Sequence, residues 1–198
     1  MKYSLILLFS FYCNFVFGTQ KNLSKDWVEN IENYFNTQLN FFESDFLQED
    51  SKGNLSSGKM FLKRKKGLMK LKYNDPNPNV IIVKDKKLTH FNRELKEKTQ
   101  VSIYSSPLFF LLDKKLDLKK NLKILSLKEN KNAVAVTFCK NDDTEGAIKI
   151  IFSKNPFQIQ CWVIYENKNS EFSRCTKIFL ENPKFSASYS EKEFETFS

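Results

Sequence analysis

Side chains that commonly carry out catalysis are scarce in this chain. Its only histidine, His90, falls in the middle of a predicted strand, and neither Gly-x-Ser-x-Gly nor a glycine-rich phosphate loop occurs. Asp142, Asp143 and Glu145 cluster in a predicted turn, where solvated carboxylates are far commoner than an acid–base pair or a calcium site. We therefore expect no enzyme, no catalytic residue, no metal site and no cofactor.

The cysteines show no chemical pattern either. Cys139, Cys161 and Cys175 are widely spaced, and they are odd in number once Cys13 is removed with the N-terminal segment described below. This spacing is neither a zinc pattern nor a disulfide framework. One bridge is compatible with an oxidising compartment, and Cys161–Cys175 is the favoured pair if their strands are neighbours. Burial as small hydrophobic side chains explains the cysteines equally well.

The N-terminus resembles a secretory signal peptide. Lys2 supplies a positive charge, and the apolar run Leu5–Phe17 is shorter than the roughly 20 residues that a membrane-spanning helix needs. Val16 and Gly18 place small residues before a cleavage site. We expect residues 1–18 to be removed and the protein to be periplasmic. A short membrane anchor is the alternative, and a lipidated Cys13 is disfavoured by the bulky aromatic residues before it.

The remaining 180 residues, 19–198, suffice for a single domain. Without Lys2 their formal charge is +8, and the lysines are spread along every segment, often alternating with apolar residues. This alternation is typical of the solvated faces of strands. A nucleic-acid stripe or a docking surface for an acidic partner is the alternative, although exported proteins seldom meet nucleic acid. The 16 phenylalanines of residues 19–198 provide a large apolar surface.

An amphipathic helix is expected near the start of the exported chain. Ser24 is a good N-cap, and Trp27, Ile31 and Tyr34 recur at helical spacing within residues 25–39. The face that they form is heavily aromatic, so this helix should cover an apolar surface.

Strands with period-two alternation follow the helix. Phe42, Phe46, Met60 and Leu62 face one way in the first two predicted strands, and Arg64 falls on the same face by strand parity. Further strands are expected near residues 79–84, 87–92, 96–103, 122–129, 132–139, 145–153, 157–166 and 172–181. One long antiparallel sheet of this kind must curl, and helices must cover its apolar face.

A helical insertion interrupts the strands. Ser106 and Pro107 are a helix N-cap and first helical residue, and residues 108–112 are strongly apolar. A second short helix is expected around residues 114–120. Both would lie over the sheet.

An ordered series of short motifs resembles the outer-membrane lipoprotein carrier family, LolA. The motifs are Phe46-x-Gln48, Ser57-Gly58-x-Met60-x-Leu62-Lys63-Arg64, Met69-x-Leu71-x-Tyr73-x-x-Pro76, Ile82, Ser106-Pro107-Leu108, Pro156, Ile159, Trp162-x-Ile164 and Lys177-Ile178-x-Leu180-x-Asn182. The series covers most of the chain in order. Departures are Lys65, where the family has proline, and the short region after Asn182.

The resemblance implies an α+β fold: an incomplete, half-open antiparallel β-barrel with an α-helical lid over an apolar cavity. It implies a periplasmic carrier that binds the acyl chains of lipoproteins released by an inner-membrane ABC complex of the LolCDE type and delivers them to an outer-membrane acceptor. Arg64 stands where the family has an arginine that latches the lid by donating to its carbonyls, here those of the helix beginning at Pro107. We expect a monomer that binds no nucleic acid.

Nine side chains are expected to line the acyl-chain cavity. They are Phe42, Phe46, Met60, Leu62, Met69, Leu71, Tyr73, Leu108 and Leu112. Two alternatives remain open: a periplasmic binder of free lipid or glycolipid, and a basic interaction protein with an ordinary packed core.

The N-terminal motif generates a direct test. Protein recovered from the periplasmic fraction should begin at Thr19, as read by N-terminal sequencing. An intact N-terminus in the membrane fraction would contradict this.

Overall fold

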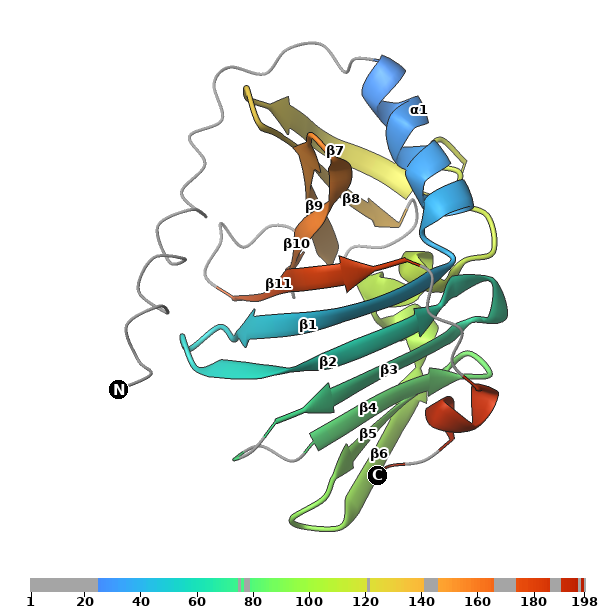
Figure 1. Cartoon of the computed structure of the whole chain (residues 1–198), viewed down its shortest axis with the longest axis vertical. Coiled ribbons are helices and arrows are strands. Elements are labelled where there is room, and N and C mark those ends of the chain that lie inside the picture. Colours follow the sequence, from blue (N-terminus) through green and yellow to red (C-terminus); the bar gives the residue numbers. More distant parts are fainter. Residues whose placement is uncertain are drawn as a thin grey trace.

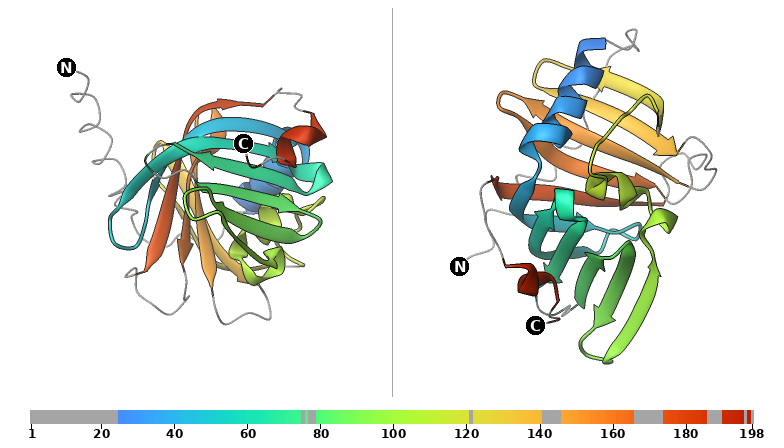
Figure 2. Two further views of the ribbon diagram at one scale, coloured as in Figure 1. Left: turned by 90° about the horizontal axis from the view of Figure 1, so that it is seen from below. Right: turned by 90° about the vertical axis from the view of Figure 1, so that its right-hand side faces the viewer.

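Among the described residues, eleven antiparallel strands form one open, strongly curled sheet (Figures 1 and 2). The structure is a computed structural model, and it describes residues 25–74, 76, 79–120, 122–140, 146–165, 174–185, 190–195 and 197. The predicted signal peptide and its cleavage site lie outside these residues, as do Asp142, Asp143 and Glu145.

The strand positions predicted from alternation are confirmed. The strands are β1 (Phe41–Glu49), β2 (Leu55–Lys63), β3 (Leu68–Tyr73), β4 (Asn79–Lys84), β5 (Lys87–Asn92), β6 (Glu97–Ser102), β7 (Leu122–Glu129), β8 (Ala133–Lys140), β9 (Ala147–Lys154), β10 (Phe157–Tyr165) and β11 (Cys175–Lys184). Their order in the sheet is β6-β5-β4-β3-β2-β1-β11-β10-β9-β8-β7. The sheet is therefore an open half-barrel, joined in the middle where β1 pairs with β11.

The predicted helix over residues 25–39 is confirmed in position but changes pitch. Residues Lys25–Asn33 form α1, and Tyr34–Gln38 form the π-helical turn η2. Ile31, Tyr34 and Phe35 are buried. In Figure 2, α1 crosses the hollow side of the curled sheet. The aromatic face of the helix therefore covers the concave face of the sheet.

The prediction of helices over residues 107–120 is wrong in its second half. Short 3₁₀ segments occur at η4 (Ile103–Ser105) and η5 (Pro107–Leu112), and the Ser106 hydroxyl caps η5 by accepting from the Leu108 amide at 3.3 Å. No helix follows over the described residues 113–120.

Side chains of the first helix explain this difference. The amide of Leu116 donates to Oδ1 of Asn36 at 2.8 Å, and the amide of Leu118 donates to Oε1 of Glu32 at 2.7 Å. Because α1 and η2 satisfy these backbone donors, the segment runs along the helix with Leu116 and Leu118 buried instead of forming its own helical turns.

The C-terminal segment packs on the opposite, convex face. In η6 (Glu191–Phe194), the Phe194 side chain is buried, and the Glu193 carbonyl accepts from the Lys70 ammonium at 3.0 Å. Lys70 points away from the face that carries Met69 and Leu71 because successive strand residues alternate. The C-terminal segment therefore covers the convex face of β3 and β4.

The register of the sheet separates the two cysteines considered for a bridge. β10 and β11 are neighbours, but Cys161 lies opposite Phe179 and Cys175 lies opposite Tyr165. The four-residue offset amounts to about 13 Å along the strands, whereas disulfides need Cα atoms within about 7 Å. The Cys161–Cys175 pairing is excluded by this register.

Within the part of the chain that the structure describes, no helix has the length and apolarity to cross a membrane.

Gly58 allows the closest packing on the concave face. It lies opposite Phe46 on one side and Tyr73 on the other, and these rings meet edge to face at 5.1 Å. A Cβ at Gly58 would lie 2.7 Å from Cζ of Phe46 and still closer to the carbonyl oxygen of Lys72. The Phe46 ring and the Lys72 carbonyl therefore occupy the space that a side chain would need.

Gly58→Ala should lower the free energy of unfolding by about 1–3 kcal/mol, because the added methyl overpacks the site. Urea denaturation would measure this. Ser57→Ala, on the exposed face of the same strand, is the control and should change stability by less than about 0.5 kcal/mol. Equal effects of both substitutions would show that the contact does not matter.

Candidate functional site

Arg64 is a buried cation at the end of the concave face. It follows β2 directly as the first residue of the 3₁₀ turn η3 (Arg64–Lys66), and its exposed fraction is 1%. Its backbone amide donates to the Asn40 carbonyl at 3.0 Å, and Gly67, in the left-handed region at φ 66°, ends the turn. This local geometry turns the guanidinium under the covering segments.

Two segments cover the concave face, namely α1 with η2 and residues 107–118, and together they are called the cover here. Both segments accept hydrogen bonds from the Arg64 side chain. Nη1 of Arg64 donates to the Phe35 carbonyl at 3.0 Å and to the Lys114 carbonyl at 3.4 Å. Phe35 belongs to η2, and its ring lies 5.7 Å from the guanidinium carbon. Lys114 follows η5 by two residues, so the expected carbonyls within the helix from Pro107 are not the acceptors. Sequence reasoning missed Phe35, although its place on the aromatic helix face was a signal.

The guanidinium loses hydration in this position. Nε and Nη2 have no hydrogen-bond partner among the described residues. Burial lowers the pKa of Arg64 to about 10, and the nearby Asp113 carboxylate opposes this shift. Burial also raises the pKa of Asp113, against the influence of Arg64. Arg64 therefore stays charged at neutral pH, although only some of its N–H groups have hydrogen-bond acceptors.

The side chains predicted to line a cavity come together on the concave face. Eight of the nine are buried in one apolar core, and Leu108 is half-buried against it. The eight are Phe42, Phe46, Met60, Leu62, Met69, Leu71, Tyr73 and Leu112. In this closed arrangement they contact one another and the covering segments. Their use by acyl chains stays a prediction.

Aromatic residues of later strands complete this face. Tyr34 of η2 meets Phe152 and Phe157 edge to face at 5.6 and 5.7 Å, and its hydroxyl accepts from the Ile159 amide at 3.4 Å. Burial raises the pKa of Tyr34 to about 12. Sequence reasoning did not select these strand residues for the site, although the alternation of β9 and β10 pointed to them. Phe110 of η5 packs similarly on Phe138, at 4.6 Å.

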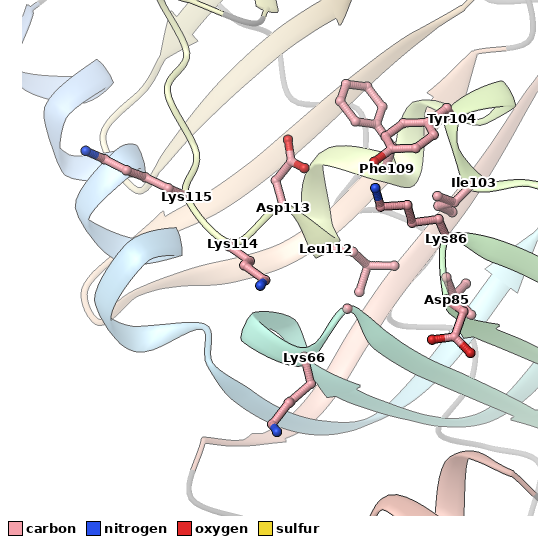
Figure 3. A pocket seen from close by; sticks show the side chains of 12 residues that line it. Lys66, Asp85, Lys86, Ile103, Tyr104, Phe109, Leu112, Asp113, Lys114 and Lys115 are labelled. Atoms are coloured by element: carbon pink, nitrogen blue, oxygen red, sulfur yellow. The ribbon is translucent and has the colours of Figure 1, made fainter.

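A pocket of about 500 Å³ opens beside the cover (Figure 3). The residues that line it come from the η3 turn, the β4–β5 turn and the segment from η4 to Lys115. They are Lys66, Gly67, Val83, Asp85, Lys86, Ile103, Tyr104, Phe109, Leu112, Asp113, Lys114 and Lys115. The pocket therefore adjoins the Arg64 contacts through Asp113 and Lys114.

The histidine and the potential metal ligands do not gather in one place among the described residues. His90 lies half-buried in β5, across from Ile81 and Thr99. Among the described residues no three His, Cys, Asp or Glu side chains gather as metal ligands would. Packed side chains fill the concave face among the described residues, so the acyl-chain cavity under a lid stays a prediction.

Comparison with known proteins agrees with this geometry. The model of the family "Outer membrane lipoprotein carrier protein LolA" matches residues 37–196. The uncharacterized protein RP864 of Rickettsia prowazekii (strain Madrid E) is 27% identical over 154 residues, 76% of this chain and 71% of that protein.

Comparison with solved structures gave a fold likeness to one protein and a weaker match to a second. An uncharacterized conserved protein from Thermus thermophilus superposes with a TM-score of 0.51 at 8% identity, covering 86% of this chain and 92% of that one. The LolA superfamily protein NE2245 from Nitrosomonas europaea gives a TM-score of 0.48 at 8% identity, with 85% and 96% covered.

Arg64→Leu should loosen the cover without unfolding the sheet. Hydrogen bonds from a charged donor contribute about 1.5–3 kcal/mol, so amide exchange in Tyr34–Gln38 should accelerate about tenfold or more. Global stability should change little, because the substitution also removes an incompletely paired buried charge. Hydrogen–deuterium exchange with mass spectrometry would measure this. Lys65→Leu, at the exposed neighbouring position, is the control, and equal exchange in both variants would disprove the latch.

Proposed function

The chain belongs to the outer membrane lipoprotein carrier family LolA, and on that premise we propose that it carries lipoproteins by binding their acyl chains on the concave face of its sheet. Members of this family are periplasmic binding or carrier proteins rather than enzymes. The proposal extends to a donor, an inner-membrane ABC releasing complex of the LolCDE type, and to an outer-membrane acceptor, with the protein acting as a periplasmic monomer.

The observation that carries the proposal is how the cover is attached. The sheet is one continuous ladder of backbone hydrogen bonds, but α1 and η2 lie outside that ladder. Their polar attachments to the sheet include contacts of three side chains: Arg64 to the Phe35 carbonyl at 3.0 Å, Trp27 Nε1 to Glu129 Oε2 at 3.0 Å, and the Ile159 amide to the Tyr34 hydroxyl at 3.4 Å. The cover can therefore lift while the sheet keeps its shape.

An acyl chain and the cover would compete for the same apolar face. Each buried CH₂ contributes about 0.8 kcal/mol, so ten methylenes supply on the order of 8 kcal/mol. Breaking the Arg64 contacts costs about 1.5–3 kcal/mol per bond. A bound chain would replace the cover's apolar contacts with the strand side chains, and the closed state would re-form once the chain leaves. That competition favours release to an acceptor.

The close packing of the concave face favours a second candidate. If Phe46, Met60 and Leu71 stay packed at all times, the protein is a basic interaction module with an ordinary core. A binder of free lipid or glycolipid would use the same face as the carrier, with a different ligand. Ligand uptake separates the module from both binders, and transfer to an acceptor separates the two binders.

Delipidated protein should bind a fluorescent fatty-acid probe, because the probe's chain can displace the cover from the concave face. Fluorescence titration would measure the affinity. Arg64→Leu should bind the probe more tightly, by up to the roughly tenfold that the lost latch contact corresponds to. Lys65→Leu should match the unaltered protein. A folded, delipidated protein that takes up no probe would support the packed module instead.

A two-step transfer assay tests the carrier role separately. Uptake of lipoprotein from inner-membrane vesicles should persist in Arg64→Leu, while handover to outer-membrane vesicles should fall, because the closed empty state no longer favours release. Equal loss of both steps would indicate misfolding, and no loss of either would show that Arg64 is not a latch here.

A further inference from the structure

We propose that the pocket beside the cover binds the anionic headgroup of an amphiphile whose acyl chain enters the concave face beneath η5. The inference rests on the proposed function, because it assumes that the concave face accepts an acyl chain. It adds a charged subsite and a ligand class, lipids that carry a phosphate or carboxylate at the head.

The lysines of the pocket form a partly uncompensated positive cluster. Four lysines and two aspartates line it. Lys66 pairs with Glu191 at 3.5 Å, whereas Lys86, Lys114 and Lys115 form no ion pair among the described residues. Figure 3 shows the ammonium groups of Lys86 and Lys114 on either side of Leu112, with Lys115 directed away. An anion between Lys86 and Lys114 would gain two charged donors.

Backbone strain places one of these lysines at the pocket. Asp85 and Lys86 are the two central residues of the β4–β5 hairpin turn, with φ of 51° and 63°. Such turns favour Asn-Gly because both positions need positive φ, a conformation that is strained for a lysine. Lys86 also accepts, through its carbonyl, a 2.9 Å bond from the Ile103 amide. The strained turn is thereby tied to the segment that bears η5.

The floor of the pocket leads into the apolar core. Val83, Ile103 and Leu112 line the pocket and also belong to the buried core. Phe109 lies half-buried beside them. A ligand whose charge sits at the lysines would therefore have its apolar end directed toward the concave face, which a free anion would not use.

The pocket is also connected to the latch. Asp113 and Lys114 are pocket residues, and the carbonyl of Lys114 accepts from Arg64. An anion drawn to Lys114 would bind the segment whose contact with Arg64 must break for a chain to enter. The headgroup and the acyl chain thus act on the same piece of backbone.

Isothermal titration calorimetry with two amphiphiles of equal chain length tests the proposal. Dodecyl phosphate should bind about tenfold more tightly than the uncharged dodecyl maltoside, and this preference should shrink as salt screens the lysines. Lys86→Gln combined with Lys114→Gln should remove the preference and leave dodecyl maltoside binding unchanged. The matched control, Lys128→Gln with Lys131→Gln in the distant β7–β8 hairpin, removes the same charge and should keep the preference.

Each of the other outcomes contradicts either the headgroup site or the proposed function. Equal binding of both amphiphiles, or equal loss in the control, overturns the headgroup site and leaves the proposed function intact. If neither amphiphile binds to folded protein, the proposed function fails, and this inference fails with it. If inorganic phosphate alone binds as tightly as dodecyl phosphate, the pocket is a free-anion site. If an unacylated tetra-aspartate peptide does so, it is a peptide-docking site.

Discussion

A single buried cation, Arg64, donates hydrogen bonds to two separate segments that cover the sheet. Arg64 follows β2 directly, and no carboxylate lies within ion-pair distance of it among the described residues. Backbone carbonyls of two separate segments solvate it instead. A full ion pair would stabilise the charge more strongly, whereas two carbonyls and two unfilled donors leave a contact that can be exchanged.

The two faces of the sheet are closed in different ways. On the convex side, η6 covers β3 and β4 with the buried Phe194 and a bond from Lys70. On the concave side, an aromatic-rich cover meets phenylalanines from several strands, and its polar attachments are few. Edge-to-face ring contacts are each worth about 0.5–1.5 kcal/mol and are not tied to one register. Contacts of this kind are compatible with the proposed binding of acyl chains, which requires the cover to separate from the sheet and to return.

The positive charge of the chain has at least two structural roles. Many lysines form the solvated faces of strands, as in Lys59, which bridges Glu43 and Asp45 on the outside of β1 and β2. The pocket lysines differ, because three separate stretches of chain bring them together over an apolar floor. Composition reports only the sum of these roles, so the net charge alone could not reveal a site for an anion.

The sequence by itself determined the strand series, the covering helix and the inward direction of Arg64, because alternation and helical periodicity are local and repeat over many residues. Tertiary structure decided what depends on long-range register. It made residues 113–120 a non-helical segment that runs along Asn36 and Glu32. It set Cys161 and Cys175 four residues out of register. It gave Arg64 the Phe35 carbonyl, 29 residues away, as a partner. Each outcome depends on which distant segments lie side by side, and local periodicity does not specify that.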